Sequence, residues 1–399
     1  MRIVLFYSGI ESFNYFTDQL VQELYLRGHE TFILDIRNPS AEDPHSYVNF
    51  AQFIEKRVDA AITFDGFGLK EDLFIELWNE QDTVTVNIEL DPPLRFHPTL
   101  LKHPRNYIQL CCDRNHVSYV KKYFSKSVEH VEFMPHAGTF MPDANVIPFA
   151  KRKYDILFSG TYYRPQEQMC KIDAWFPKGE LMNDFYREMA VYMQQHSKLT
   201  TEQAALDTIA RMNLKVTDDL LRSIFRGSEP MDWMIRMYHR GRVIQTLAEA
   251  GFELWLLGRG WENHTSAQFS NVHRIDDRIP FAQTLPYMAD AKISLNVMPW
   301  FKAGTHERLF NSLLQHALLL TDTSSWIEEN YAAGEEIAVY DLDHLEELPG
   351  MVQGLLGDEQ RAEQMIQKGY EKTVQNFTWT NCTDRVLAAI QKLLRRGLK

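Results

Sequence analysis

Four short turns in the sequence combine glycine with polar or charged side chains, and each turn follows an apolar run. They occupy residues 8–11, 159–161, 258–261 and 303–308. In open parallel α/β sheets a ligand binds beyond the carboxyl ends of the strands, where glycine lets the backbone approach it and helix N-termini attract anions. None of the four turns has the GxGxxG or GxxxxGK[ST] pattern, so NAD binding and ATP hydrolysis lose their usual sequence support.

The last of these turns carries the richest chemistry. Gly304 and Thr305 are followed by His306, Glu307 and Arg308 at the expected start of a helix. Imidazole and guanidinium groups donate to phosphate oxygens, and a carboxylate accepts from ribose hydroxyls. The turn therefore favours a diphosphate and a ribose as ligands. An ordinary capped helix, with its charged side chains in water, is the alternative interpretation.

The two preceding turns supply further candidate donor contacts. These are Ser159, Gly160, Thr161, Gly258, Arg259, Gly260 and Trp261. Glycine after a strand is more often only a turn residue, because it is the default residue for positive φ. Aromatic residues such as Trp261, Trp300 and Tyr162 are more often part of a core than stacked on a ligand.

The elements that must position these turns alternate between strand and helix. In the first half, strands are expected at residues 2–8, 31–36, 60–64, 84–88, 107–111 and 130–134. A helix is expected over residues 11–27, with Gly28 ending it. Such alternation predicts a parallel sheet that helices cover on both faces.

The pattern lapses over residues 135–153 and then starts again with a strand at 154–158. Further strands are expected at 252–257, 272–275, 293–297, 318–321 and 337–340. We predict an α/β protein of two Rossmann-like, doubly wound domains, residues 1–145 and 146–357. Residues 167–240 read as a helical insertion in the second domain, and residues 358–399 as C-terminal helices that pack back toward the first.

Composition limits the classes of function. A chain of 399 residues with 45% hydrophobic content can bury two cores. A net charge of -12 with scattered Lys and Arg argues against a nucleic-acid partner. The 14 His and four Cys show no metal-ligand spacing, so no metal site is expected, and the cysteines are expected to be buried thiols. Without a signal peptide or transmembrane run, the sequence is typical of a cytoplasmic protein.

The order of the motifs resembles the bacterial GT-B glycosyltransferases related to the spore-maturation protein CgeB, of the group 1 type. The matching segments of the second half are residues 154–160, 257–261, 293–297, Gly304, 308–311 and 318–322. Residues 89–93 resemble the acidic-proline turn of the same group, and residues 134–138 its hinge. Two positions depart from the pattern: Asn311 stands where relatives have glutamate, and His316 where a small residue is expected.

The resemblance implies transfer of a sugar from a nucleoside-diphosphate sugar, UDP favoured, to a hydroxyl of a glycan, protein or cell-surface component in the interdomain cleft. No obligatory metal and no cofactor beyond the donor is implied. Arg308, then Arg259, would stabilise the departing diphosphate. If the anomeric centre inverts, Asp91, Asp65 or Glu11 would serve as the base. Each acid also has a structural reading, as a turn residue or in the first turn of a helix.

Two alternatives to transfer stay open. Because Asn311 replaces the glutamate that accepts from the donor ribose in relatives, the chain would also suit a catalytically silent nucleotide-sugar-binding protein, such as a spore or cell-surface assembly factor. Glu307, one helical turn earlier, is a candidate substitute for that glutamate. A nucleotide-sugar epimerase on the same fold is the second alternative.

Overall fold

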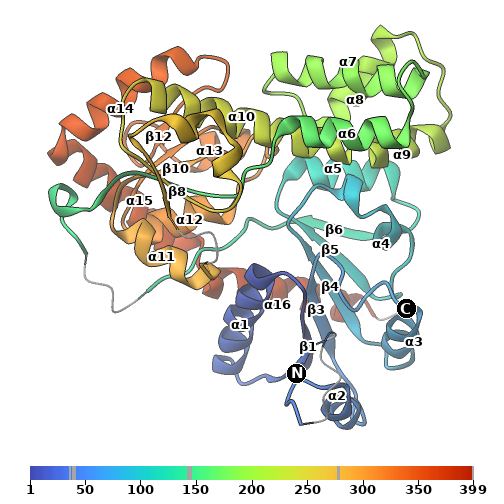
Figure 1. Ribbon diagram of the computed structural model, residues 1–399. Helices are drawn as coiled ribbons and strands as arrows, with labels where there is room; N and C mark the ends of the chain where they lie inside the picture. Colours follow the sequence, from blue (N-terminus) through green and yellow to red (C-terminus); the bar gives the residue numbers. More distant parts are fainter. Residues whose placement is uncertain (36, 38–41, 142–145, 276–278, 398–399) are drawn as a thin grey trace. The chain divides into compact units, whose positions relative to one another are not determined.

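The computed structural model describes residues 1–35, 37, 42–141, 146–275 and 279–397. The chain divides into two compact units (Figure 1). Unit 1 comprises Met1–Ala137, Pro280–Ala282 and Phe377–Lys399, and unit 2 comprises Gly138–Ile279 and Gln283–Asn376. Each unit is built on one six-stranded parallel sheet. The predicted class of two Rossmann-like α/β domains is confirmed.

Unit 1 has the strand order β2-β1-β3-β4-β5-β6. Its strands are β1 (Arg2–Tyr7), β2 (Glu30–Asp35), β3 (Ala60–Phe64), β4 (Val84–Glu89), β5 (Tyr107–Cys111) and β6 (His130–Phe133). Every residue of β3, β4 and β5 is buried, as expected of central parallel strands covered on both faces. This burial accounts for the largely apolar run of β3, whereas β4 and β5 also bury polar side chains such as Asn87 and Gln109.

Helices from both ends of the chain complete the core of unit 1. They are α1 (Glu11–Leu26), α2 (Tyr47–Phe53), α3 (Asp72–Glu80), α4 (His97–Leu101), α5 (Arg114–Tyr123) and α16 (Trp379–Arg396). Leu20 and Leu24 of α1 share one hydrophobic cluster with Val386 and Ile390 of α16 and with β1. Gly28 ends α1 with φ 76° and donates its N–H to the Tyr25 carbonyl at 2.9 Å, as the sequence predicts.

Unit 2 has the strand order β12-β11-β10-β7-β8-β9, so its strand order reverses between β7 and β10. Its strands are β7 (Tyr154–Ser159), β8 (Leu254–Leu257), β9 (Val272–Ile275), β10 (Ala291–Asn296), β11 (Leu318–Thr321) and β12 (Ala338–Val339). In sheets of this kind ligands bind outside the carboxyl ends of the strands at the reversal. A ligand-binding site is therefore expected at the turns that follow β7 and β10.

The segment between β7 and β8, which includes residues 167–240, is helical. It contains α6 (Pro165–Trp175), α7 (Leu181–Gln195), α8 (Thr201–Arg211), α9 (Asp218–Gly227) and α10 (Glu229–Glu249). Figure 1 shows α6 to α9 gathered as one group. The C-terminal part of α10 instead packs on the sheet, where Val243, Ile244 and Leu247 join the core of unit 2. The insertion and the sheet thus share one continuous helix.

The other helices of unit 2 follow the strands in order. They are α11 (Phe281–Ala289), whose first residues belong to unit 1, α12 (Glu307–Leu314), α13 (Ser325–Asn330), α14 (Leu348–Gly357) and α15 (Glu359–Asn376). Short 3₁₀ helices lie at Pro93–Arg95, Phe149–Lys151, Trp261–Asn263, Thr265–Gln268 and Leu345–Glu347. None of the helices in the described part of the chain is both long and apolar enough to cross a membrane.

The unit boundaries add detail to the sequence-based division. The chain passes from unit 1 to unit 2 after Ala137, whereas the predicted boundary at residue 145 lies outside the described residues. Of the two C-terminal helices, α15 belongs to unit 2 and α16 to unit 1. The break between them is a capping box in which Thr378 and Asn381 bond each other's backbone N–H.

The prediction of buried cysteines holds for three of the four. Cys111, Cys112 and Cys382 are buried, and burial raises the pKa of each thiol. Cys170 is exposed on α6, so the expectation is wrong for this residue. Its helix lies in the insertion, where one face meets water.

Candidate functional site

The turns after β7 and β8 in unit 2 are bonded directly to each other. The Gly160 N–H donates to the Leu257 carbonyl at 2.8 Å, and the Tyr162 N–H donates to the Arg259 carbonyl at 2.9 Å. The Trp261 indole Nε1 donates to the Gly160 carbonyl at 2.8 Å, and its ring stacks on Tyr162 at 4.9 Å. Trp261 is buried, so it braces the turn rather than presenting its ring to solvent.

This contact explains the Gly-x-Gly-Trp pattern physically. A Cβ on Gly258 would lie 2.5 Å from the Gly160 carbonyl oxygen, and a Cβ on Gly260 would lie 1.9 Å from the Tyr162 carbonyl oxygen. Both glycines also have positive φ, of 140° and 85°. The close approach that glycine permits here is therefore made by another stretch of backbone. The pair of turns forms a rigid floor at the ends of β7 and β8.

The turn before α12 contains the other predicted donor contacts. Residues 303–305 are buried, and His306 is the N-cap of α12, its Nδ1 accepting from the Arg308 N–H at 3.4 Å. The same ring lies against the Glu307 carboxylate and within 3.4 Å of the Arg308 guanidinium. The N-terminus of α12 thus carries a connected set of imidazole, carboxylate and guanidinium groups, as the sequence predicted.

Two arginines that the sequence analysis did not select join Arg308. Arg236 and Arg240 lie one turn apart on α10, and their guanidinium carbons stand 4.1 and 5.2 Å from the centroid of the Trp300 ring. Arg240 and Arg308 both approach the Phe158 ring, at 5.9 and 5.8 Å. Aromatic faces attract cations in this geometry. We call Arg236, Arg240 and Arg308 the arginine cluster.

The arginine cluster is buried and only partly neutralised. Burial lowers the pKa of Arg240 and Arg308, and the neighbouring guanidinium groups lower the pKa of Arg240 further. Asp232 pairs with Arg236 at 2.8 Å, and the Glu307 carboxylate favours the charged forms of Arg240 and Arg308. Because guanidinium groups stay protonated in proteins, a bound anion would offset the energetic cost of this buried positive charge.

Three buried donors of this region have no hydrogen-bond partner among the described residues. They are Arg240 Nε, Arg308 Nη1 and Trp300 Nε1. Leaving a buried donor unpaired costs about 1–3 kcal/mol, so such atoms are rare in folded proteins. A Cβ built on Gly160 would lie 3.7 Å from Arg308 Nη1, so this donor lies beside the turn after β7. Phosphate oxygens are acceptors that suit all three donors.

A carboxyl group lies close to the arginine cluster. Asp322 follows β11, is 2% exposed and accepts from the Met298 N–H at 2.8 Å. Burial raises the pKa of Asp322 to about 6, and the charges of Lys302 and Arg308 oppose this rise. At neutral pH Asp322 therefore contributes a buried negative charge that is costly to desolvate.

The structure shows what replaces the expected glutamate at position 311. Asn311 is 1% exposed, and its Oδ1 accepts from the Thr139 N–H at 2.8 Å. Gln315 bonds the carbonyl of the same Thr139 at 2.7 Å. A Cβ on Gly138 would lie 2.7 Å from the Phe310 Cβ, so this segment passes tightly over α12. Asn311 therefore secures the beginning of unit 2 to α12.

The second departure from the pattern also has a backbone cause. His316 has φ 56°, in the left-handed region that favours glycine. Its ring stacks on Tyr370 of α15 at 3.9 Å. His316 thus occupies a left-handed turn at the position where a small residue was expected, and its ring gains an aromatic contact.

Two of the three candidate bases come together in unit 1. Asp65, with φ 52°, accepts from the Leu90 N–H at 2.9 Å, and Asp91 pairs with Arg95 at 2.9 Å. Between them lies Glu89, which the sequence analysis missed and which is fully buried. Burial and then the charge of Asp65 raise the pKa of Glu89 well above its usual value. The carboxyl ends of β3 and β4 thus form an acidic edge.

Glu11 has a different environment from the other two acids. It is the exposed first residue of α1, and its carboxylate accepts from the Phe281 N–H at 3.0 Å. The Phe281 ring packs on Tyr15 and Phe16 of the same helix. Glu11 therefore helps to hold the short segment Pro280–Ala282 in unit 1.

The missed residues left only a weak signal in the sequence. Arg236 and Arg240 stand at i and i+4 of a helix whose neighbours are largely apolar, a spacing that places two cations on one buried face. Asp322 directly follows an apolar strand, as catalytic and binding residues of such sheets often do. Neither pattern shows, without the three-dimensional structure, which residues these side chains contact.

One family model matches part of the chain. Residues 240–388, which include Arg240, Trp300, Arg308 and Asp322, match the family model described as glycosyl transferase-like. No curated protein sequence matches the chain.

Solved structures match the whole chain at low sequence identity. The sucrose-phosphate synthase of Thermosynechococcus elongatus aligns with a TM-score of 0.57 at 10% identity, covering 100% of both chains. The HepE protein of Anabaena in complex with UDP-glucose aligns at 0.53 and 9%, covering 98% of this chain and 100% of that one. An α-glucosyltransferase in complex with UDP and DNA aligns at 0.53 and 11%, covering 98% and 99%. The chain has the GT-B fold, and the fold and the family match together indicate a glycosyltransferase.

The close contact between the two glycine turns predicts that a side chain at position 260 destabilises the protein. Gly251 has nearly the same φ, 83°, but a Cβ there would meet no atom within 4 Å, so Gly251→Ala is a matched control. We expect Gly251→Ala to lower the free energy of unfolding by about 1–2 kcal/mol, the cost of left-handed backbone. Gly260→Ala should lower it by roughly 1–3 kcal/mol more, because a carbonyl must also move. Chemical denaturation measures both, and equal losses would contradict the interpretation.

The raised pKa of Asp322 predicts a pH-dependent stability. The folded state binds this proton up to about pH 6, whereas the unfolded state releases it near 3.8, so the group's contribution falls as pH rises through this window. Asp322→Asn keeps an oxygen for the Met298 N–H without the charge. We expect it to raise the free energy of unfolding by about 3 kcal/mol at pH 7.5 and by almost nothing at pH 4. Urea denaturation at both pH values tests this, and a gain that is independent of pH would refute it.

Proposed function

We propose that this protein transfers a sugar from a nucleoside-diphosphate sugar, with UDP as the favoured nucleotide, to a hydroxyl acceptor. The observation that carries the proposal is the set of three unpaired donors around the arginine cluster, Arg240 Nε, Arg308 Nη1 and Trp300 Nε1. They lie at the carboxyl side of β7 and β10, where the strand order reverses. A diphosphate supplies several acceptor oxygens and two negative charges to this buried cluster.

The same residues have a role in the chemical step. When the glycosidic bond to the donor breaks, negative charge develops on the departing phosphate oxygen. Arg308 and Arg240 would stabilise that charge from fixed positions, together with the N-terminus of α12. Because the guanidinium groups already supply positive charge, the proposed transfer needs no divalent metal. Arg259 is exposed and takes a lesser role, as a contact at the rim.

UDP is favoured on the evidence of structural neighbours. The HepE protein of Anabaena was solved with UDP and with UDP-glucose, the α-glucosyltransferase was solved with UDP, and both share the fold of this chain. The turns after β7 and β8 would form the floor of the donor site, with Ser159, Gly160 and Thr161 on one side and residues 258–261 on the other. His306 and Glu307 offer an imidazole and a carboxylate for the donor's hydroxyls.

The acceptor hydroxyl requires a base if the anomeric centre inverts. Asp91 is our candidate, because its side chain is 27% exposed while the residue Asp65 is 8% exposed. Arg95 would hold the Asp91 carboxylate in place, and Glu89 would add to the acidic edge behind it. Glu11 is a weaker candidate, because its carboxylate already bonds a backbone N–H. A retaining mechanism would use none of these acids.

One observation favours a second candidate function, binding without transfer. Asn311 stands at the position of the expected ribose-binding glutamate. Its side-chain carbonyl oxygen already accepts a hydrogen bond from the Thr139 N–H. A protein that held a nucleotide sugar without transferring it would tolerate this change. Glu307, on the same face of α12 one turn earlier, would restore a carboxylate to the site.

The donor site predicts stabilisation by UDP. At a UDP concentration of a hundred times Kd, binding contributes about 2.7 kcal/mol and should raise Tm by roughly 5–10 °C. Arg308→Ala and Arg240→Ala should each remove most of this UDP-dependent shift, whatever they do to Tm in the absence of UDP. The exposed Arg226 on α9 supplies the control, and Arg226→Ala should keep the full shift. An unchanged Tm of the wild-type protein with UDP, GDP and TDP would reject the proposed donor site.

Turnover distinguishes transfer from binding. The protein is incubated with UDP-glucose and a panel of glycan and alcohol acceptors, and the products are measured by mass spectrometry. A glycosyltransferase yields UDP and a glycosylated acceptor, and Asp91→Asn should slow an inverting reaction by about 10²–10⁴-fold while UDP binding persists. An intact donor would favour the silent binder. A donor whose sugar changes without any acceptor would point to an epimerase.

A further inference from the structure

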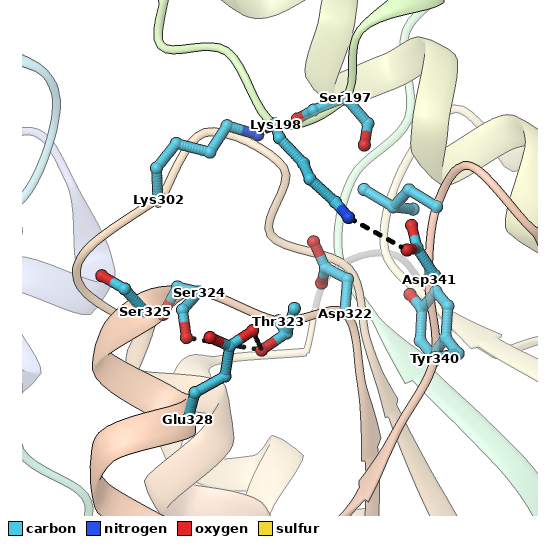
Figure 2. A pocket seen from close by; sticks show the side chains of 11 residues that line it. Ser197, Lys198, Lys302, Asp322, Thr323, Ser324, Ser325, Glu328, Tyr340 and Asp341 are labelled. Atoms are coloured by element: carbon cyan, nitrogen blue, oxygen red, sulfur yellow. Dashed lines mark hydrogen bonds and ion pairs between the residues drawn. The ribbon is translucent and has the colours of Figure 1, made fainter.

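A second polar pocket lies in unit 2 at the carboxyl ends of β11 and β12, and the proposed transfer assigns it no role. Its volume is about 200 Å³ (Figure 2). The helical insertion contributes one wall through the loop between α7 and α8, and the loop after β10 contributes another. The lining residues are Ser197, Lys198, Lys302, Asp322, Thr323, Ser324, Ser325, Glu328, Tyr340, Asp341 and Leu342.

The lining offers both hydrogen-bond donors and acceptors over a small area. Ammonium groups face carboxylates across the pocket, hydroxyl groups line one side, and Leu342 is the one aliphatic side chain of the lining. Figure 2 shows Lys198 and Lys302 reaching in from different segments, with the Asp322 carboxylate directed into the same hollow. A surface of this kind recognises a ligand that is itself rich in groups that donate and accept.

The charges of the pocket argue against an anion. Lys198 pairs with Asp341 at 3.2 Å and Lys302 donates to the Ser197 carbonyl, so each ammonium group has one protein partner and keeps further N–H donors. Three carboxylates line the same space, on Asp322, Glu328 and Asp341. A phosphate would meet more negative than positive charge here, in contrast to the arginine cluster.

A metal ion and an apolar ligand fit no better. Within the described ranges, no group of three or more His, Cys, Asp or Glu side chains is placed to hold a metal. Glu328 accepts a hydrogen bond from the Thr323 hydroxyl at 3.3 Å, so this carboxylate already acts as an acceptor for a hydroxyl group. The ligand that matches this lining is neutral and carries several hydroxyl groups.

Size and position narrow the ligand further. Pockets for drug-sized ligands measure about 300–1,000 Å³, so a space of about 200 Å³ suits a single ring. Asp322 is 2% exposed and interacts electrostatically with Arg308, which places the pocket beside the arginine cluster. One oxygen of Asp322 is fixed by the Met298 N–H, and this bond orients the carboxyl group.

We infer that this pocket binds a single neutral sugar ring through its hydroxyl groups, with Asp322 as the principal acceptor and Lys198 of the helical insertion as a donor. The inference that a sugar ring binds here depends only on the hydrogen-bonding groups and charges of the lining residues. The identification of that ring as the sugar of the donor rests on the proposed function, because it requires the diphosphate to occupy the neighbouring arginine cluster. A separate sugar, free or part of an acceptor, would use the same contacts.

Calorimetric titration of the full chain separates the two sources of the ring. The probes are UDP, the UDP-linked forms of glucose, galactose and N-acetylglucosamine, and the same three sugars free. If the ring belongs to the donor, at least one UDP-sugar should bind about tenfold or more tightly than UDP, the effect of one hydrogen bond to a charged group. If the ring comes from elsewhere, a free sugar should bind and should bind equally well in the presence of UDP.

Variants test whether the pocket itself is responsible. Asp322→Asn should remove most of the sugar-dependent affinity, measured as the ratio of the Kd of UDP to the Kd of the UDP-sugar in the same variant. This ratio cancels any change in UDP binding itself, which follows from the electrostatic interaction between Asp322 and Arg308. Lys198→Ala, at a side chain that is 73% exposed, should weaken the same component without a folding cost. Asp343→Asn is the control, because Asp343 is an exposed carboxylate two residues beyond Asp341 that does not line the pocket. This control should keep the full affinity.

The outcomes separate the two proposals. The sugar pocket would be rejected, and the donor site kept, if UDP binds but no sugar adds affinity. The same conclusion would follow if a sugar adds affinity and both pocket variants keep that added affinity. Sugar binding that Asp322→Asn abolishes, in a protein that does not bind UDP, would reject the proposed donor and support the pocket. Loss of UDP affinity in Lys198→Ala would also count against the pocket, because that residue would then serve the nucleotide.

Discussion

Three guanidinium groups lie buried beside two aromatic rings in unit 2, and neighbouring groups reduce the cost of that burial. Arg236 and Arg240 lie over Trp300, and Arg308 lies over Phe158. Trp300 and Phe158 offer their aromatic faces to the cations, and Asp232 and Glu307 offer negative charge. The Thr161 carbonyl accepts from Arg240 at 2.9 Å. Desolvated charge is expensive, so a protein keeps such a group where a ligand or a reaction uses it. Three donors of this region, Arg240 Nε, Arg308 Nη1 and Trp300 Nε1, have no protein partner among the described residues.

The backbone beside this charge has very little freedom. The turns after β7 and β8 hold each other through backbone hydrogen bonds at positions where a Cβ would collide with a carbonyl. Arg308 Nη1 lies beside these turns, 3.7 Å from a Cβ built on Gly160. Preorganised donors of this kind stabilise developing charge without the cost of reorienting during a reaction. Charge and rigidity are therefore properties of one small region, to which α10, α12 and two turns contribute.

The sequence was sufficient to predict the fold class and most of the strands and helices, but not the contacts that individual residues make. The strand at residues 60–64 was predicted with its observed bounds, because a strand buried on both faces leaves a continuous apolar run. The glycines at 258 and 260 were predicted as ligand contacts, and the structure shows them against another turn. The local sequence does not distinguish a glycine that a ligand contacts from a glycine that the backbone of a neighbouring turn contacts.

Long-range contacts account for the remaining differences. The spacing of Arg236 and Arg240 is visible in the sequence, but their convergence with Arg308 depends on packing between α10 and the loop that carries Trp300. The substitution at Asn311 is equally visible, whereas its partner Thr139 lies 172 residues away in the chain. Roles of this kind are set by tertiary structure, and periodicity along one element carries no information about them.

The place of α16 in unit 1 has a consequence for the order in which the protein is made. The sheet of unit 1 is synthesised first, yet the helix that shares its core with α1 follows every residue of unit 2 along the chain. Until α16 emerges from the ribosome, the apolar face that receives Val386 and Ile390 lacks its cover. Exposed apolar surface of this kind invites aggregation during synthesis. Unit 2, whose sheet and α15 precede α16, is able to complete its core before the unit that begins the chain.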